Sequence, residues 1–316
     1  MASVQFSVVI ACYNQRGYVA DSVQSALSQI HESREVIVVD DASTDGTAEV
    51  LRSFGDSIRL IALEKNQGAS AARNAGTAAA RGNYIVYLDG DDVLKPWALS
   101  VYDRIIQARK PVMILGSLTW FQDLVPALTE ADTPSRIELV SYENWAEKDR
   151  PFRSSASALI VERRVLETIG GWTKEVWPFD DQFLAVELAH SGRTIRIVNP
   201  ATVFYRLHAT NNFHNVPALI SGCYNLVATW TSRRHFLGQP GHLESAALIG
   251  GPALYAVKRA FRAGLRKDGL RLFLRVWPWV AATVVVRLWR VFFKRPVEII
   301  SVQIEPREKA AQRGVA

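Results

Sequence analysis

The first 120 residues alternate regularly between short β-branched runs and segments of helical composition, and this alternation constrains the fold more than any other feature. Two of the runs, at 36–39 and 85–88, are apolar at every position, which is typical of strands buried on both faces. Such strands form largely parallel sheets covered by helices on both sides. The expected strands span 4–11, 35–40, 58–63, 84–89 and 112–119, and the expected helices span 17–29, 44–54, 69–81 and 96–109.

The composition is that of a folded chain with a sizeable core. Of the 316 residues, 48% are apolar and 22% are charged, which excludes a disordered chain, a fibre and a polytopic membrane protein. This length suits one large domain with an appendage, or two domains. Cys12 and Cys223 show no CxxC spacing, so we expect a reducing compartment. The N-terminus has no basic segment before its first apolar run, so we expect no signal peptide and a cytoplasmic location.

The charge is distributed unevenly along the chain. Residues 251–316 hold 14 Lys and Arg against four acids, a net charge of +10. The whole chain carries +6, so the preceding 250 residues carry a net −4. A basic segment after a mildly acidic body predicts an anionic surface as partner.

Polar residues follow three of the expected strands. The first strand is followed by Tyr13 and Asn14, the second by the segment 40–46, and the fourth by Asp89-Gly90-Asp91-Asp92. In open parallel sheets, ligands bind outside the carboxyl ends of the strands. Three carboxylates within four residues repel one another unless a cation lies among them, and oxygen ligands favour Mg²⁺ or Mn²⁺ over zinc. The pattern therefore predicts a metal and diphosphate site.

Other features around these strand ends narrow the possibilities. Lys65 and Arg73 are candidate contacts for a phosphate or a base. Ser43 and Thr44 have two interpretations of equal weight: they belong to a ligand-binding loop, or they only cap the next helix. The sequence contains neither GxGxxG after the first strand nor GxxxxGK[ST], which excludes a dinucleotide-binding fingerprint and a P-loop.

Four segments together resemble the family 2 inverting glycosyltransferases. They are 7–14 (SVVIACYN), 38–47 (VVDDASTDGT), 66–76 (NQGASAARNAG) and 87–92 (YLDGDD), in the family's order and spacing. The resemblance implies the A-type glycosyltransferase fold, an α/β fold with a Rossmann-like, mostly parallel sheet flanked by helices. It also implies transfer of a sugar from a nucleotide-sugar, commonly UDP-linked, with inversion at the anomeric carbon.

The resemblance assigns residues to the donor and to a metal. The loop from Ala11 to Asn14 would lie along the base and ribose, and Asp40 or Asp41 would contact the nucleoside. The positions matching the family's nucleotide-sugar contacts are Ala11, Tyr13, Asn14, Asp40, Asp41, Arg73, Asp89, Gly90 and Trp172. Asp89 and Asp91 match the acidic pair that holds Mn²⁺ or Mg²⁺, with Asp91 as the expected direct ligand.

The second half of the chain carries the expected catalytic base. Segments 154–161 and 164–172 resemble the strand, helix and Gly-Gly-aromatic turn that face the donor sugar and acceptor in this family. Asp180-Asp181 stands where the family has Glu-Asp at the start of a helix. An inverting transfer needs one carboxylate to take the proton of the acceptor hydroxyl. Asp181 is the expected base and Asp180 the residue that orients the acceptor; the alternative is two acids that merely stabilise a helix N-terminus.

Arg206-Leu-His208 matches an Arg-x-His that the family often has at this place. His208 would complete the metal site, or close over the donor together with Arg206. A third interpretation is an ordinary surface histidine. The polar residues Asn211, Asn212 and His214 extend this loop.

The C-terminal third has the composition of membrane-seeking helices. Helices are expected over 216–236 and 244–267, with a break at Asp268-Gly269 and a further helix over 272–293. On 244–267 the expected cationic stripe is Lys258, Arg262 and Arg266, and the expected apolar stripe is Leu254, Val257, Phe261 and Leu265. The longest charge-free run, 276–286, has 11 residues, whereas a spanning helix needs about 20. Three tryptophans at 277, 279 and 289 with flanking arginines indicate an interfacial amphipathic helix. The alternative is a helical subdomain with a solvated basic face.

These observations define an expected organisation and two functions. The catalytic domain would span 1–215, with a nucleotide half at 1–120 and an acceptor half at 121–215. A helical appendage would follow at 216–295 and a loose tail at 296–316. The first function is a metal-dependent glycosyltransferase of cell-surface polysaccharide synthesis, with a glycan or lipid-linked acceptor, peripheral membrane contact through 254–294 and no nucleic acid partner. The second is a non-catalytic binding module of the same fold in a membrane complex.

Overall fold

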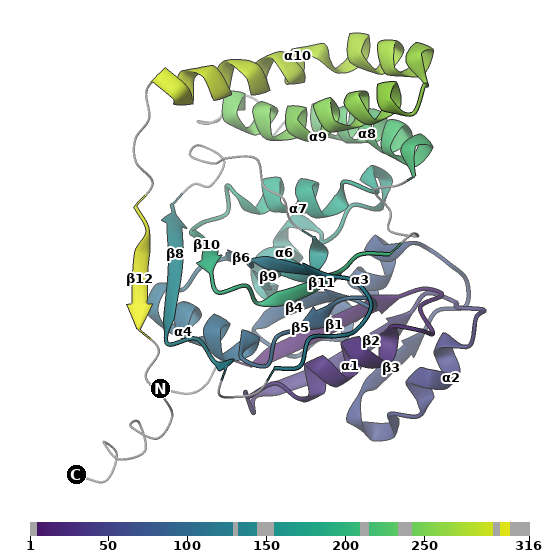
Figure 1. Ribbon diagram of the computed structural model, residues 1–316, viewed down its shortest axis with the longest axis vertical. Helices are drawn as coiled ribbons and strands as arrows, with labels where there is room; N and C mark the ends of the chain where they lie inside the picture. The colour runs from purple at the N-terminus through teal and green to yellow at the C-terminus, as the bar shows by residue number, and fades with distance from the viewer. Residues whose placement is uncertain are drawn as a thin grey trace.

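The computed structural model describes residues 5–128, 132–143, 155–208, 215–232, 242–292 and 298–303. A nine-stranded sheet lies at its centre, in the order β12-β8-β10-β6-β9-β4-β1-β2-β3 (Figure 1). Its strands are β1 (Phe6–Cys12), β2 (Arg34–Asp40), β3 (Arg59–Ala62), β4 (Tyr84–Asp89), β6 (Met113–Leu115), β8 (Arg136–Tyr142), β9 (Leu159–Glu162), β10 (Thr194–Asn199) and β12 (Ile300–Gln303). A small sheet is formed by β5 (Val93–Leu94), β11 (Val203–Arg206) and β7 (Leu118–Phe121).

The central sheet is mixed, with four of its eight neighbouring strand pairs parallel, and its β1 to β4 part is parallel as expected from the sequence. The strands β1, β2, β3 and β4 pair in parallel, and β6 pairs in parallel with β10. Within this sheet, β8 and β9 run against the common direction, and β9 is inserted between β4 and β6. This places the carboxyl ends of β1, β2 and β4 at one edge of the sheet.

Helices cover both faces because successive strand residues point to opposite sides. On β1, Phe6, Val8 and Ile10 enter one core and Val9 and Ala11 enter the other. The first core lies under α1 (Val19–Leu27), α2 (Thr47–Arg52) and α4 (Ala98–Arg109). The second lies under α3 (Ala69–Ala79), α6 (Arg163–Ile169) and α7 (Asp180–Leu188). Short 3₁₀ turns occur at η1 (Gly55–Ser57), η3 (Ala156–Ala158) and η4 (Lys174–Val176).

Three C-terminal helices extend the second core. They are α8 (Val216–Ser232), α9 (His242–Arg262) and α10 (Arg266–Phe292). Cys223 on α8, Ile249 on α9 and Val276 on α10 belong to the same buried cluster as Phe183 on α7. Figure 1 shows α10 as the outermost layer, with α8 and α9 between it and α7. The helical appendage is therefore packed continuously onto the α/β body.

Three sequence predictions need correction. The strand expected over 112–119 is two strands, because Gly116 donates to Ala158 O and Thr202 donates to Ser117 O, which separates β6 from β7. The helix break lies before Arg266 and not at Asp268-Gly269, because Gly264 has a φ of +78° and ends α9 there, while Gly269 lies inside α10. The tail expected over 296–316 is not loose at Ile300–Gln303, which form β12 against β8. Residues 304–316 lie outside the described residues.

Candidate donor and acceptor site

The loops that follow β1 and β2 are joined by side-chain hydrogen bonds. Asn14, with a φ of +52°, donates its backbone N–H to Ser43 Oγ at 2.9 Å, and its Oδ1 accepts the Thr44 N–H at 2.8 Å. Tyr13 stands exposed beside this junction, while the Ala11 side chain is buried in the sheet. The structure therefore brings the predicted base and ribose loop against the second strand end. Ser43 and Thr44 bond to Asn14, and neither caps α2, which begins after Gly46.

Asp40 and Asp41 are both buried, and they hold different segments. Asp40 Oδ1 accepts the N–H of Ser43 at 3.1 Å. Asp41 accepts two backbone N–H groups, from Gln67 at 2.8 Å and from Gly68 at 2.7 Å. Asp41 thus fixes the entrance to α3, the helix that carries Arg73. The contact of either residue with a nucleoside stays a prediction.

The acidic cluster after β4 is confirmed as a group, and its three members have different surroundings. Carboxylate oxygens of Asp89, Asp91 and Asp92 lie within 4.8 Å of one another. Asp92 is fully buried, accepts Ser157 Oγ at 2.5 Å and the Arg206 N–H at 3.0 Å, and its pKa is raised by burial and by the two neighbouring carboxylates. Asp89 and Asp91 keep part of their surface open, with side-chain exposures of 26% and 14%.

Gly90 lies between these acids and ties them to β1. Its backbone N–H donates to Ala11 O at 3.0 Å, which joins the loop after β4 to the end of β1.

His208 lies beside the acidic cluster, where the sequence placed it. Its Nε2 is 2.8 Å from Asp91 Oδ2, and its ring stacks on Tyr18 with centroids 5.0 Å apart. Two carboxylates and one imidazole form a donor set that fits Mn²⁺ or Mg²⁺. Asp89, Asp91 and His208 are the residues that would hold such an ion. The loop residues Asn211, Asn212 and His214 lie outside the described residues.

Arg206 is held by contacts within the protein, which leave its side chain no freedom to close over a donor. Its guanidinium pairs with Asp21 at 2.7 Å and donates to Asp91 O and Asp123 O. The rings of Tyr18 and Phe121 lie within 5 Å of it. These contacts fix β11 to the acidic loop, so Arg206 orients the backbone that carries Asp91. Tyr18 is a site residue that sequence reasoning missed, since an isolated tyrosine at a helix start carries no signal.

Arg73 connects the two halves of the site. Its Nη2 is 2.6 Å from Asp89 Oδ1, its Nη1 is 2.9 Å from Asp180 Oδ2, and it lies 4.5 Å from the centroid of the Trp172 ring. The guanidinium is buried, and the two carboxylates raise its pKa above the usual value. One cation therefore joins the acid after β4 to the first acid of α7.

Trp172 packs against Arg73 and is itself held in place by its neighbours. Asn74 bonds to both the backbone N–H and the carbonyl of Trp172, at 2.8 and 2.9 Å, and the indole packs edge-on to Tyr87. The ring is buried, so it reaches the site through Arg73. Direct contact of Trp172 with a donor stays a prediction.

Asp180 and Asp181 have separate environments. Asp180 is buried and takes the hydrogen bonds of both Arg73 and Ser70, the latter at 2.7 Å. Asp181 accepts the N–H of Gln182 at 2.7 Å and remains partly exposed. Loss of hydration and the charge of Asp180 raise the pKa of Asp181 to about 8. An elevated pKa near the working pH suits a proton acceptor. Ser70 and Ser157, which hold Asp180 and Asp92, were not predicted, because their partners lie 110 and 65 residues away.

Comparison with known proteins places this site in a family. Residues 7–164 match glycosyl transferase family 2. The chain belongs to glycosyl transferase family 2.

Relatives and solved structures agree with this assignment. The chain is 27% identical to the UDP-Glc:alpha-D-GlcNAc-diphosphoundecaprenol beta-1,3-glucosyltransferase WfaP of Escherichia coli, over 64% of this chain and 77% of that protein. The crystal structure of S. aureus TarS 1-349 in complex with UDP-GlcNAc covers 86% of this chain and 90% of its own, with a TM-score of 0.55 and 14% identity. The mannosyltransferase PcManGT of Pyrobaculum calidifontis, in complex with GDP-Man and Mn²⁺, covers 92% and 88%, with a TM-score of 0.52 and 20% identity. At these identities the two structures show a shared fold.

Other curated relatives align over shorter stretches. The succinoglycan biosynthesis protein ExoO of Rhizobium meliloti is 45% identical over 89 residues, and the match covers 26% of its length. The match with this chain covers 36% of the putative teichuronic acid biosynthesis glycosyltransferase TuaG of Bacillus subtilis and 66% of an uncharacterized glycosyltransferase of Nostoc sp..

Proposed function

We propose that this protein transfers a sugar from a nucleotide-sugar, UDP-linked, to a glycan or lipid-linked acceptor with inversion of the anomeric carbon. The observation that carries the proposal is the Arg73 bridge between Asp89 and Asp180. It puts the acid that would face a donor diphosphate and the first acid of α7, the helix that carries Asp181, on either side of one fixed cation. The relatives support the substrate classes, since WfaP is named for a UDP-sugar and a diphosphoundecaprenol acceptor.

The donor would lie across the ends of β1, β2 and β4. Tyr13 and Asn14 would flank the base and ribose, and Asp89, Asp91 and His208 would hold Mn²⁺ or Mg²⁺ beside the diphosphate. When bound, such a cation neutralises charge on the diphosphate leaving group. Arg73 holds the Asp89 carboxylate in place through its ion pair.

Asp181 would act as the base. The acceptor hydroxyl loses its proton to the Asp181 carboxylate while its oxygen bonds to the anomeric carbon, and the bond from that carbon to the diphosphate oxygen breaks on the opposite face. Asp180 is engaged by Arg73 and Ser70, so its role is to position α7. These contacts favour Asp181 over Asp180 as the base.

A non-catalytic binding module is the alternative. Such a module has no use for a partly exposed carboxylate with a pKa near 8 beside the donor site, and Asp181 is one. Nucleotide-sugar hydrolysis separates the two functions. We expect one member of a nucleotide-sugar panel to be hydrolysed with Mn²⁺ and not with a chelator. Tight nucleotide binding with no turnover of any member would establish the binding module.

The outer face of α10 would hold the enzyme on a membrane. Its buried side contributes Leu272, Val276, Val280 and Val286 to the core. On the opposite side, eight large apolar residues are 40–64% exposed: Leu270, Phe273, Leu274, Trp277, Val284, Val285, Leu288 and Trp289. Exposed cations flank this apolar face, and they include Lys267, Arg271 and Arg287. Apolar residues bordered by cations favour the surface of an anionic bilayer.

Among the described residues, one helix passes the length and composition test for a membrane span, α10 over Arg266–Trp289 with a mean hydropathy of 1.4. Its contacts favour a helix that lies on the surface. Thr283 Oγ1 donates to Ala247 O of α9 at 2.7 Å, and Leu272 and Val276 are part of the common core. A spanning helix would have to leave these contacts. Phe261 of α9, a member of the expected apolar stripe, is exposed and adds to the outer apolar surface.

We therefore propose a peripheral location on the cytoplasmic face of the membrane. Sedimentation with vesicles of phosphatidylglycerol and of phosphatidylcholine tests it. Binding to the anionic vesicles that falls with salt supports the proposal. If the protein binds neither kind of vesicle at any salt concentration, α10 is a solvated helix. If the protein stays with the membrane during alkaline extraction, α10 is a spanning helix.

A further inference from the structure

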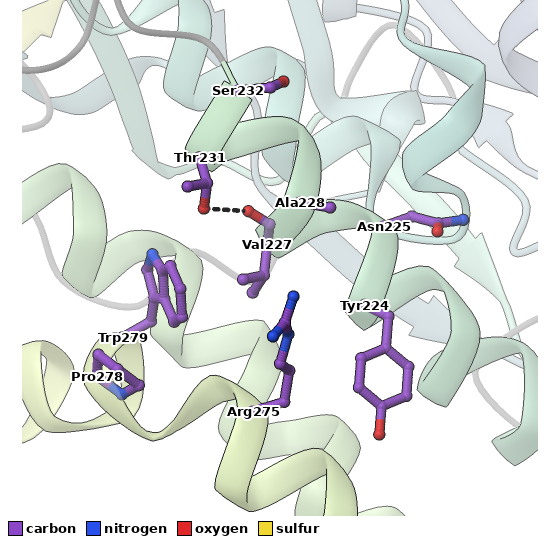
Figure 2. Close-up of a pocket in the computed structure, with 9 residues that line it drawn as sticks. All are labelled: Tyr224, Asn225, Val227, Ala228, Thr231, Ser232, Arg275, Pro278 and Trp279. Carbon is purple, nitrogen blue, oxygen red and sulfur yellow. Dashed lines mark hydrogen bonds between the residues drawn. The ribbon is translucent and has the colours of Figure 1, made fainter.

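A cavity of about 700 Å³, open to solvent, lies between α8 and α10, away from the strand ends. Figure 2 shows its lining: Tyr224, Asn225, Val227, Ala228, Thr231 and Ser232 from α8, and Arg275, Pro278 and Trp279 from α10. This volume is within the usual range of ligand sites, about 300–1,000 Å³. The proposed catalytic groups and the outer face of α10 leave this cavity without a role.

The lining combines one cation with apolar walls. In Figure 2 the Arg275 guanidinium extends between the two helices, toward Val227 and past the Tyr224 ring. The Trp279 indole and the Pro278 ring form the wall on the α10 side. The Thr231 hydroxyl is already bonded to Val227 O within α8, at 2.7 Å. The cavity therefore offers a positive charge and hydrophobic surface.

The charge on Arg275 lacks an internal partner. In the part of the chain that the structure describes, no carboxylate pairs with Arg275, whereas Arg271, one turn earlier, lies 3.9 Å from Asp268. An unpaired guanidinium is suited to a phosphate group. Arg275 thus specifies an anionic head for whatever occupies the cavity.

The cavity also lies beside the proposed membrane face. Trp277 belongs to the exposed apolar face of α10, and Pro278, the next residue and about 100° further around the helix, lines the cavity. A lipid chain in the membrane leaflet that α10 would contact could enter from this side without crossing the body of the protein. The apolar walls would then contact the hydrocarbon chain of the lipid, and Arg275 would bind its phosphate group.

The α8 wall is fixed to the segment that carries the proposed base. A side chain at Gly222 of α8 would place its Cβ 2.3 Å from Trp177 O and 2.6 Å from Pro178, so only glycine allows this contact. Pro178 is separated from Asp180 by one residue. An amphiphile bound along α8 would therefore contact a helix that packs directly against the segment before α7.

We infer that the cavity between α8 and α10 binds the phosphate and the first part of the chain of a prenyl phosphate, the lipid end of a lipid-linked acceptor. This inference rests on the proposed function for its biological meaning. The binding itself is measurable without turnover.

The test is binding of farnesyl phosphate to the full chain, compared with farnesol and inorganic phosphate. We expect farnesyl phosphate to bind more tightly than either part. Arg275→Gln should weaken it about tenfold, the effect of one charge-assisted hydrogen bond, and bring it near farnesol. Arg271→Gln is the matched control, since Arg271 is exposed on the same helix and does not line the cavity. Equal loss in the two variants would show diffuse surface attraction and overturn the inference.

A second pair of variants tests the cavity volume. Ala228→Trp should fill the space and abolish farnesyl phosphate binding. Ser221→Trp, two turns earlier on α8 and outside the cavity, should not change it. Unchanged binding in Ala228→Trp, with a melting temperature like that of wild type, would overturn the inference.

Two further measurements separate this inference from others. Binding to phosphatidylglycerol vesicles should be equal in Ala228→Trp and Ser221→Trp; a loss confined to Ala228→Trp would make the cavity a phospholipid site and overturn the prenyl assignment. Donor hydrolysis without acceptor should persist in all four variants. Absence of hydrolysis in wild type would defeat the proposed function, whereas intact hydrolysis with no farnesyl phosphate binding would defeat only the cavity site.

Discussion

The acids at the strand ends and the cations on the C-terminal helices differ in how their charge is compensated. At the strand ends, Arg73 pairs with Asp89 and Asp180, and Asp92 is satisfied by Ser157 and the Arg206 backbone. On α9 and α10, within the described residues, Lys258, Arg262 and Arg287 are exposed and have no carboxylate partner. The first region is held in a fixed geometry by internal pairs, and the second leaves its cations open to the anionic membrane surface that we propose. Substitutions in the two regions should therefore fail in different ways.

The largest effect is expected at Asp91, the expected direct ligand of the metal. Asp91→Asn should abolish Mn²⁺-dependent nucleotide binding and reduce hydrolysis by about 1,000-fold, because several kcal/mol of charge stabilisation are lost. Calorimetry with UDP, with and without Mn²⁺, measures the binding. Asp56→Asn, an exposed acid of η1, is the control. Unchanged Mn²⁺-dependent binding would refute the metal assignment.

Asp181→Asn should separate binding from chemistry. Transfer should fall at least about 100-fold while nucleotide affinity is retained, because a general base acts only in the reaction step. In wild type, kcat/KM should rise with pH up to about 8, since the base must be ionised. Retained turnover in the variant would move the base to another residue.

Stability gives an independent check on Asp181. Folding raises its pKa, so ionisation opposes folding, and the wild type should lose stability as pH rises from about 4 to about 8. Asp181→Asn should lose less over this window. Parallel pH profiles of urea unfolding would contradict the raised pKa.

Arg73→Met tests the internal compensation directly. Removing the cation leaves Asp89 and Asp180 as uncompensated carboxylates, and the free energy of unfolding should fall by about 3 kcal/mol. Urea denaturation measures this. Arg262→Met, which removes an exposed cation with no carboxylate partner among the described residues, should change stability little. Similar losses in both variants would remove the contrast between the two regions.

The apolar face of α10 should affect membrane binding and leave stability unchanged. Trp277→Glu should weaken binding to anionic vesicles at least about tenfold, because about 2 kcal/mol of apolar burial in the bilayer is lost. Leu124→Glu, also exposed and far from α10 in sequence, is the control. A fall in melting temperature without loss of vesicle binding would show that Trp277 packs within the protein.

The smallest effect is expected from a single cation. Arg287→Gln should weaken binding to anionic vesicles about fivefold at low salt, since one charge near such a surface contributes about 1 kcal/mol. The difference should vanish at high salt. A salt-independent effect would indicate a specific contact.

The sequence predicted the parallel half of the sheet and the strand-end acids because both are local patterns. Apolar runs such as 36–39 define buried strands, and the carboxyl end of each is read directly from the chain. The link from Arg73 to Asp180 was not predictable, since it joins residues 107 apart, one on α3 and one at the start of α7. The insertion of β9 between β4 and β6 and the addition of β12 at the sheet edge also depend on long-range pairing.

The C-terminal helices show the same limit. Composition predicted their amphipathic character, and the exposed face of α10 agrees with it. The end of α9 at Gly264 was missed because Asp268-Gly269 carries an equally strong local signal. The cavity lined by Arg275 arises from the crossing of α8 and α10, which no local pattern encodes.

The anomeric configuration of the product tests the central claim most directly. The nucleotide-sugar that the enzyme hydrolyses with Mn²⁺ would be incubated with enzyme and acceptor, and the new linkage examined by NMR. We predict a linkage inverted relative to the donor, formed by wild type and lost in Asp181→Asn. A linkage that keeps the donor configuration, or equal product from both proteins, would contradict a single displacement with Asp181 as the base.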